Sequence, residues 1–496
     1  MSNNGITVVN NYNNPSNDNL KFANILKSCV SSSSKTEELI QQSAPPVNDI
    51  GDISPKNYSK KQIIVDAHKE YFGNMWGEDS TKYFEKYDEE AKKESKPNQW
   101  IPAPRIPTQK TGVEEITFDF NDGCRIFVPT ETSKEYRIIA GDEDRGMVFF
   151  DNKVKPGTFI RSIKKYYIKY FIIIMDGDKE LFNYVMDLKD KRVLIQNPVS
   201  SLGDGIAWFS FIERFKIQYQ CKLTAYMAPM HIALFSNQYP DINMVTEEGA
   251  KNIQPYATYF TGLFFKDNQD YQVMDFKHTG LHTTIAHIFD IKDKSDIPPR
   301  VDLSAPRQIK EPYVCIACHG SSPLKQWTNP HGWYDVVKFL KSVGYKVLCM
   351  DKSPVEGDGI HYTQSIPWGT EDYTGDKSLQ ERINILKDAD FFIGGSSGLA
   401  WLAWCCKIPV VMISGFTLPF NEFYTPYRIL NPHVCHGCWN DNKVTFDHFD
   451  DRWCPYHKDT PREFECNRLI SSTYVINTIK TIPNYIKQAT AFIENK

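Results

Sequence analysis

The sequence predicts an α/β protein: a small antiparallel β-rich domain, then two doubly wound domains, then a cysteine-rich metal segment. Three observations support this fold class. Short β-rich runs, broken by Asn, Asp and Gly turns, fill residues 113–190. Strand, glycine turn and helix then alternate through residues 191–430, which is typical of parallel sheets covered by helices. Four cysteines with the spacing of metal ligands follow in residues 431–470.

Composition sets the scale and excludes some functions. The chain has 496 residues, of which 41% are hydrophobic, and a net charge of -4. This length is typical of two to four domains with substantial cores. The charges are mixed in sign and form no basic stripe, so we expect no nucleic-acid partner.

The N-terminus and the apolar runs favour a cytoplasmic protein. The first residues, MSNNGITVVNNYNNPSNDN, are polar and lack the apolar region of a signal peptide. The run YFIIIM is strand-sized, well below the roughly 20 residues that span a bilayer. We therefore expect no membrane span. In a reducing compartment the 12 cysteines are expected as thiols or metal ligands, not disulfides.

The N-terminal part divides by composition. Residues 1–60 are rich in Asn, Ser and Pro and are expected to be a disordered tether. Residues 61–112 are predicted to be a helical extension, with a helix over 62–95 and a Pro-rich connector after it. Residues 113–190 are predicted to form a small antiparallel barrel or sandwich.

One short motif in this β-rich domain has two interpretations. Asp176-Gly177-Asp178 has the spelling of the metal-binding DxD of nucleotide-sugar enzymes. The same residues suit a hairpin turn that closes the Ile-rich strand before them, and we favour the turn.

The two doubly wound domains are predicted at 191–305 and 306–430, and a C-terminal helix at 471–496. Parallel α/β domains bind ligands at the carboxyl ends of their strands. A ligand site is therefore expected in the cleft between the two domains.

The first candidate site residue is Asp204, which lies between two glycines after the strand RVLIQN. A glycine turn at a strand end can present an acidic side chain to the cleft, where it accepts a proton from a substrate hydroxyl. Asp204 also suits the N-cap of a helix over 205–215. The sequence leaves both roles open, and they are compatible.

The second candidate is Lys325, in the loop after the strand YVCIA. Small residues and one ammonium group there are suited to holding a phosphate, although a surface lysine fits the pattern too. Cys315 and Cys318 form a C-x2-C in the same region. We interpret them as core thiols at a strand end, not as a redox pair.

The third candidate is the turn Ser396-Ser397-Gly398, which follows a strand ending in two glycines and opens a helix. The free N–H groups of a helix N-terminus suit a diphosphate, and an ordinary capped helix is the alternative. Asp351 ends another strand, where an acidic residue often binds ribose hydroxyls, but it is equally suited to a turn.

The fourth candidate is a metal site made by Cys435, Cys438, Cys454 and Cys466, spaced C-x2-C-x15-C-x11-C. Two knuckle thiolates and two later ones can complete a tetrahedron around zinc or a single iron. Because four sulfur ligands leave no open coordination position, the site is predicted to be structural.

These motifs together resemble the bacterial autotransporter heptosyltransferases of the TibC type, which are related to glycosyltransferase family 9. The resemblance covers roughly residues 113–496 and is specific because the motifs occur in order. The segments that carry it are SLGDGIAWF, LKQWTNPHGWYDVVKFLKSVGYKVLCMD, DADFFIGGSSGLAWLAW and the run from NPHVCHGCWND to Cys466.

The resemblance implies a GT-B architecture preceded by a small β-barrel. It implies transfer of heptose from ADP-heptose to serine hydroxyls of an autotransporter passenger, with inversion and without metal in the chemistry. By the same matching, Asp204 is the catalytic base, Lys325 the donor-phosphate lysine, and Ser396, Ser397 and Gly398 the diphosphate-binding turn.

The resemblance also implies that the four cysteines hold one structural Fe, with Zn as the alternative, and that the chain forms a homo-oligomer, a ring-like dodecamer in the family. The first 110 or so residues look like an addition beyond the usual start. Two alternatives remain: a related enzyme with another nucleotide sugar or a lipopolysaccharide-core acceptor, and a non-catalytic, metal-stabilised scaffold.

Overall fold

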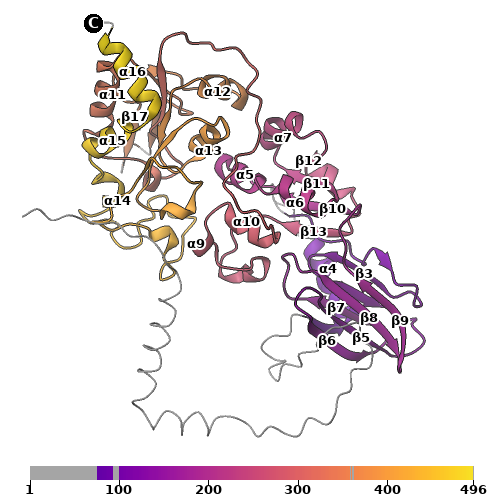
Figure 1. The fold of residues 1–496 in the computed structure, drawn as a ribbon. Coiled ribbons are helices and arrows are strands. Elements are labelled where there is room, and N and C mark those ends of the chain that lie inside the picture. The colour runs from indigo at the N-terminus through magenta and orange to yellow at the C-terminus, as the bar shows by residue number, and fades with distance from the viewer. Residues whose placement is uncertain (1–74, 93–99, 358, 360–361, 495–496) are drawn as a thin grey trace, which may run out of the picture. The chain divides into compact units, whose positions relative to one another are not determined.

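The computed structural model describes residues 75–92, 100–357, 359 and 362–494 (Figure 1). The predictions for residues 1–60, and for the ends of the expected helix at 62–74 and 93–95, lie outside the described residues.

The start of the described chain is a strand where the sequence predicted a helix. Strand β1 (Met75–Asp79) pairs antiparallel with β7 (Thr158–Ser162), and helix α4 (Ser80–Ala91) begins only after it. Arg161 on β7 lies 4.7 Å from the ring of Trp76 on β1. The prediction of helix at 75–79 was wrong because pairing with a distant strand outweighs local propensity.

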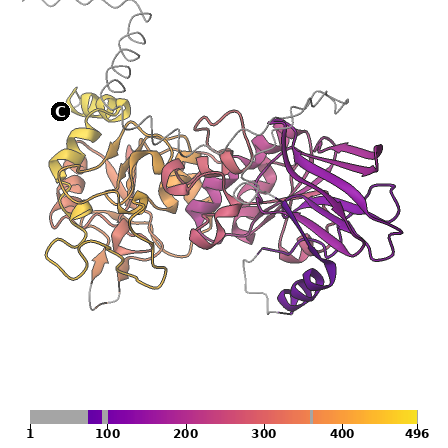
Figure 2. The same ribbon diagram turned by 90° about the horizontal axis from the view of Figure 1, so that it is seen from below.

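The β-rich domain consists of two antiparallel sheets that share one apolar core (Figure 2). The first sheet has the strand order β6-β5-β8-β9. Its strands are β5 (Tyr136–Asp142), β6 (Met147–Val154), β8 (Tyr170–Asp176) and β9 (Lys179–Val185). Asp176 pairs with Lys179 across the β8–β9 turn, where Gly177 adopts a φ of 58°. The hairpin interpretation of Asp176-Gly177-Asp178 is therefore confirmed.

The second sheet joins the domain that follows. It contains β2 (Gln109–Lys110), β3 (Thr117–Asn121), β4 (Arg125–Val128), β7 and β1. Strand β3 pairs in parallel with β13 (Ala257–Phe260) of the first doubly wound domain. Within the described ranges no strand pairing closes the two sheets into a ring, so the sandwich alternative describes this region and the barrel does not. The β3–β13 pairing joins the two predicted domains in one sheet, and the boundary at residue 190 stays a prediction.

The first parallel sheet has the order β13-β10-β11-β12, with β10 (Arg192–Asn197), β11 (Lys222–Met227) and β12 (Asn243–Val245). Its helices are α5 (Leu202–Phe209), α6 (Ile212–Tyr219), α7 (Pro229–Phe235), α8 (Glu247–Lys251), α9 (Phe276–Thr279) and α10 (Thr283–Ile288). Short 3₁₀ turns lie at Ser236–Gln238 and Lys266–Tyr271. The helix expected over 205–215 is thus two helices that meet near Ser210.

The second parallel sheet has the order β18-β15-β14-β19-β20-β21. In chain order this is 3-2-1-4-5-6, the order of a dinucleotide-binding fold. Its strands are β14 (Tyr313–Ala317), β15 (Lys346–Cys349), β18 (Glu371–Asp372), β19 (Phe392–Gly394), β20 (Val410–Ile413) and β21 (Arg428–Ile429). Its helices are α11 (Gly332–Ser342), α12 (Leu379–Leu386) and α13 (Gly398–Cys405), with a hairpin of β16 (Val355–Gly357) and β17 (Thr363–Ser365). The prediction of two parallel α/β series is confirmed.

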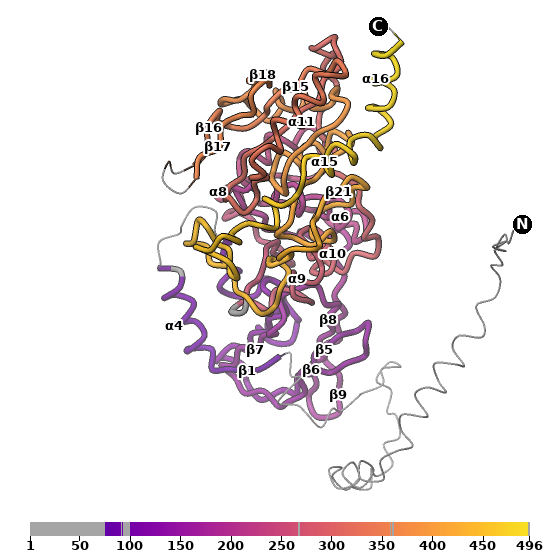
Figure 3. The backbone as a smooth tube through the Cα atoms, turned by 90° about the vertical axis from the view of Figure 1, so that its left-hand side faces the viewer, coloured from indigo at the N-terminus to yellow at the C-terminus, as the bar shows by residue number. Residues whose placement is uncertain are grey.

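The cysteine-rich segment has little regular structure, with a 3₁₀ turn at Cys438–Asn440 and helix α14 (Glu465–Arg468). Two helices, α15 (Ser472–Ile479) and α16 (Pro483–Glu494), replace the one C-terminal helix predicted. The helix breaks because Pro483 lacks an N–H and so suits the first turn of a new helix. Helix α15 packs beside α11 (Figure 3).

No helix in the described part of the chain is both long and apolar enough to cross a bilayer.

Candidate active site and cysteine centre

The two parallel sheets each send a helix toward the same place. Helix α5 follows β10 in the first sheet, α13 follows β19 in the second, and the two helices pack together (Figure 1). A Cβ on Gly203 would lie 3.1 Å from the Trp401 side chain, and a Cβ on Gly398 would lie 2.9 Å from Cβ of Leu202. Glycines at these two positions therefore let the helix N-termini approach closely.

Asp204 lies in the first turn of α5, one of the two helices that meet here. The N-cap residue of this helix is Ser201, so the N-cap role considered for Asp204 is wrong. Burial raises the pKa of Asp204 above its ordinary value, and the nearby Lys325 ammonium and Ser201 hydroxyl partly offset this rise. The structure thus brings the predicted base and the predicted phosphate lysine into electrostatic contact across the two domains.

Lys325 is partly buried and ends a 3₁₀ turn, η3 (Pro323–Lys325). Its carbonyl oxygen lies against Gly395, where an added Cβ would come within 2.3 Å. The glycine after β19 is therefore required for the Lys325 loop to lie next to the start of α13. Asp204, Lys325 and the 396–398 turn therefore lie near one another, and their roles stay predictions.

The side chain of Ser396 is held by the protein. Its hydroxyl donates to Glu422 at 2.7 Å, and Asn421 donates to the same carboxylate at 3.0 Å. Arg428 forms an ion pair with Glu422, which is 2% exposed. The Ser396-Ser397-Gly398 turn therefore rests on a buried charge pair, and its diphosphate contacts stay a prediction.

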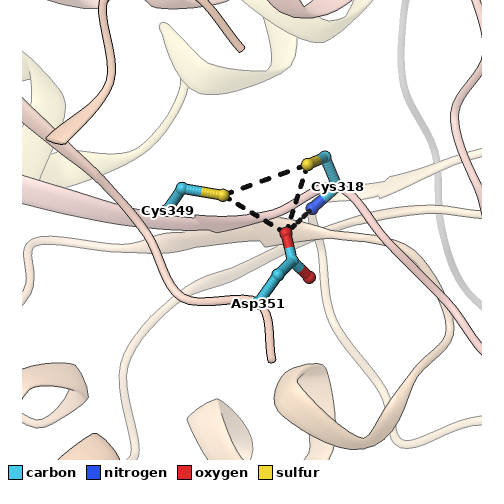
Figure 4. Close-up of side chains that lie close together, drawn as sticks. All are labelled: Cys318, Cys349 and Asp351. Carbon is cyan, nitrogen blue, oxygen red and sulfur yellow. Dashed lines mark hydrogen bonds between the residues drawn. The ribbon is translucent and has the colours of Figure 1, made fainter. Parts of the chain in front are cut away.

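Asp351 lies beside Cys318 and Cys349, near the start of the loop that follows β14 (Figure 4). Its carboxylate is 3% exposed and accepts the N–H groups of Cys318 at 2.8 Å and His319 at 3.2 Å. The thiols of Cys318 and Cys349 donate to it at 3.1 and 3.2 Å. Asp351 thus caps the end of the β14 strand, and its predicted ribose contact stays a prediction.

The same three side chains have the ligand types of a metal site, since their sulfur and oxygen atoms lie within 4.8 Å of one another. The four donor groups already satisfy the Asp351 carboxylate. Cys315 belongs to a different core cluster from Cys318, and both are buried. The interpretation of the C-x2-C as core thiols is therefore confirmed.

The four predicted metal ligands line one small cavity, but no three of their sulfur atoms lie within 4.8 Å of one another. Cys435, Cys438, Cys454 and Cys466 line a single cavity of about 10 Å³, which is room for one atom-sized guest. Gly437, with a φ of 69°, makes the knuckle turn between the first two cysteines. The backbone N–H of Cys435 is fixed by the Glu465 carboxylate at 3.0 Å. Four cysteines are the ligand type of a soft metal ion, and the metal site itself stays a prediction.

Sequence reasoning missed two residues that support Asp204 and Ser396. One is Glu422, described above. The other is His231 on α7, which is fully buried against Gly205, where a Cβ would lie 2.1 Å from its Nε2. Burial lowers the pKa of His231 to about 4. Gly205 was the sequence signal that could have indicated His231, because a glycine next to Asp204 leaves room for a closely packed side chain.

Comparison with known proteins agrees with this fold. The family model described as glycosyltransferase family 9 (heptosyltransferase) matches residues 278–445, and the model for the N-terminal domain of glycosyltransferase TibC matches residues 112–178. These matches, together with two parallel-sheet domains whose helices α5 and α13 pack against each other, define a glycosyltransferase.

Two curated relatives and one solved structure make the assignment specific. Autotransporter heptosyltransferase Aah of Escherichia coli is 45% identical over 389 residues, which are 78% of this chain and 98% of Aah. BimC of Burkholderia thailandensis, described as an inactive autotransporter heptosyltransferase, is 37% identical over 77% of this chain and 89% of its own. A crystal structure of dodecameric, iron-containing heptosyltransferase TibC of Escherichia coli, in complex with ADP-D-beta-D-heptose, matches with a TM-score of 0.73 and 42% identity. That match covers 79% of this chain and 100% of the TibC chain.

The chain therefore belongs to the autotransporter heptosyltransferase family, as the resemblance predicted, and is a glycosyltransferase.

Proposed function

We propose that this chain transfers heptose from ADP-heptose to serine hydroxyls of an autotransporter passenger protein, with inversion at the anomeric carbon. The observation that carries the proposal is the electrostatic influence of Lys325 of one domain on Asp204 of the other, beside the N-terminus of α13. Family membership and the TibC complex with ADP-D-beta-D-heptose support the donor.

In this mechanism Asp204 is the general base. A serine hydroxyl attacks the anomeric carbon while Asp204 takes its proton. The raised pKa of Asp204 strengthens it as a proton acceptor once it is ionised. The nearby Lys325 ammonium favours the ionised form, so the two residues together suit proton transfer.

The leaving ADP is stabilised from the opposite domain. Lys325 and the N–H groups at the start of α13 face the charge that grows on the diphosphate as the glycosidic bond breaks. Direct displacement by the serine oxygen inverts the anomeric centre. Asp351 contributes to donor binding by fixing the loop that carries Lys325, with ribose contact as its second proposed role.

We further propose that Cys435, Cys438, Cys454 and Cys466 hold one structural Fe, with Zn as the alternative. The four cysteines line one cavity, and TibC is described as iron-containing; both observations support the proposal. The ion supplies cross-linking of the segment and no step of the transfer. By analogy with dodecameric TibC we propose a dodecamer that works in the cytoplasm.

The decisive experiment is intact-mass analysis of a passenger fragment incubated with the purified protein and ADP-heptose. We expect mass to increase in steps of one heptose residue. Asp204→Asn should reduce transfer by about 10² to 10⁴-fold while ADP binding, measured by calorimetry, persists. Transfer by Asp204→Asn near the wild-type rate would remove Asp204 as the base.

The same experiment separates the alternatives. Wild-type protein that binds ADP-heptose but modifies only lipopolysaccharide core would replace the acceptor, and binding of another nucleotide sugar alone would replace the donor. A folded protein that binds no nucleotide sugar would favour the scaffold, and the inactive relative BimC gives that outcome a precedent.

A further inference from the structure

The loop that carries Lys325 is attached to the cysteine segment by a buried asparagine. Asn467, next to Cys466 in the chain, is 1% exposed. Its Nδ2 donates to the carbonyl of Leu324 at 2.6 Å, and its Oδ1 accepts from the N–H of Gly415 at 2.6 Å. One side chain thus joins the residue before Lys325 to the end of strand β20.

Further bonds hold the same loop on the same support. Ser322 donates to the carbonyl of Asp451 at 3.1 Å, and Trp327 Nε1 donates to the carbonyl of Ile470 at 2.9 Å. Asn329 donates to the carbonyl of Ile470 at 3.1 Å. Both acceptor residues, Asp451 and Ile470, lie within the cysteine segment, so its fold sets the path of residues 322–329.

Apolar contacts also join the Lys325 loop to the cysteine segment. The side chain of Leu324 is buried and lines the cavity that the four cysteines surround. Leu324 and Cys466 belong to one core cluster. Gly415 leaves space for the chain at Cys466, since a Cβ there would lie 2.3 Å from the Cys466 carbonyl oxygen. A change at the cysteine centre therefore reaches Leu324 directly.

We propose that Asn467 is a positioning residue that couples the cysteine centre to Lys325, so that the fold of the cysteine segment sets the affinity for the donor diphosphate. The proposal rests on the function proposed above for Lys325. Without the Asn467 bridge, the Leu324 carbonyl loses a buried donor, and the attachment that holds Lys325 near Asp204 and α13 is weakened.

The chain supplies a matched control in Asn440, a second buried asparagine of the cysteine segment, two residues after Cys438. It is 8% exposed. Its Oδ1 accepts from the N–H of Leu418 at 2.9 Å, and its Nδ2 donates to the carbonyl of Lys277 at 3.0 Å. Asn440 thus makes the same kind of bridge as Asn467 but away from the Lys325 loop.

The test measures ADP affinity by calorimetry for the wild type and for Asn467→Ala, Asn440→Ala, Lys325→Ala and Asn467→Ala/Lys325→Ala. Bound metal per chain and the melting temperature are measured in parallel. We expect Asn467→Ala to weaken ADP binding by about tenfold at unchanged metal content. Asn440→Ala should leave ADP affinity within about twofold, and the double variant should bind no more weakly than Lys325→Ala.

The outcomes separate this proposal from the proposed function. Wild-type protein that binds no ADP contradicts the proposed donor site. Suppose instead that the wild type binds ADP. Equal losses of ADP affinity in Asn467→Ala and Asn440→Ala would then overturn the coupling through Asn467. Additive losses of ADP affinity in the double variant would overturn it too. If Asn467→Ala does not fold, Asn467→Asp replaces it, because the carboxylate keeps the bond from Gly415 and loses only the donor to Leu324.

Discussion

At the scale of residues, His231 is a buried side chain whose charged form destabilises the fold. It lies beneath the first turn of α5 with no exposed surface, and its pKa is lowered to about 4 from an ordinary 6.5. Backbone groups of Val199 and Leu202 lie near the ring, but among the described residues neither makes a hydrogen bond of normal geometry with it. Folding therefore requires the neutral imidazole.

This predicts an acid-sensitive fold. The folded pKa lies below the unfolded one, so the unfolded chain binds more protons, and stability is full above pH 6.5 and falls toward pH 4. Between pH 7.5 and pH 5 the loss from this group is about 2 kcal/mol. The melting temperature of His231→Gln should be lower than that of the wild type at pH 7.5. The difference in melting temperature should be roughly 5 °C smaller at pH 5, because only the wild type loses stability through His231. A gap independent of pH would contradict the assignment, and His433→Gln, at an exposed position, is the control.

Sequence alone could suggest a functional residue where an acidic or basic side chain directly follows a predicted parallel strand. Asp204 and Lys325 each follow a parallel strand, and parallel sheets bring such ends together. The supporting residues could not be found this way. The Glu422–Ser396 and Asn467–Leu324 hydrogen bonds join residues that are far apart in the chain. No local spacing in the sequence predicts either bond.

At the scale of elements, β3 and β4 are joined by a buried ion pair. Asp119 and Arg125 are cross-strand neighbours, with exposed fractions of 0% and 1%. The guanidinium donates twice to the carboxylate, at 2.9 and 2.7 Å, and once to the carbonyl of Pro104 at 2.7 Å. The pair therefore fixes the Pro-rich connector onto the sheet that continues into the first doubly wound domain.

Arg125→Met should cost about 3–5 kcal/mol, because it leaves the Asp119 carboxylate buried without its partner. The matched control is Arg137→Met, which breaks a pair with Asp151 whose side chains are 38% and 27% exposed. That change should cost about 1 kcal/mol or less. Urea denaturation of both variants measures the difference, and equal losses would show that burial does not set the strength of the Arg125 pair.

Elements were predictable where their signals are local. The hairpin at Gly177 and the capped helix α12, with its Ser378–Glu381 capping box, follow from nearby residues. Strand β1 and the parallel pairing of β3 with β13 depend on partners far along the chain. An isolated strand pattern does not identify the partner of a strand, so the sequence left barrel and sandwich open and did not show that the sheet continues into the next domain.

At the scale of the whole molecule, the cysteine segment touches both parallel-sheet domains. It supports the Lys325 loop through Asn467, and it accepts the Lys277 ammonium of the first domain at the carbonyls of Asp441, 2.7 Å away, and Val444, 2.5 Å away. In the described ranges it is held by a few short turns, without long helices or strands of its own. An ion among its cysteines is therefore expected to stabilise the contact between the domains as well as the segment itself.

Cys454→Ser should accordingly lose the ion and weaken the whole assembly. A thiolate ligand is replaced by a poor one, and a loss of a few kcal/mol lowers the melting temperature by roughly 5–10 °C. Metal analysis, thermal melting and size-exclusion chromatography with light scattering measure the three effects. Cys221→Ser, at a buried thiol outside the segment, should keep its metal and its oligomeric state. A metal-free Cys454→Ser protein that melts, assembles and transfers heptose like the wild type would show that the ion has no structural role.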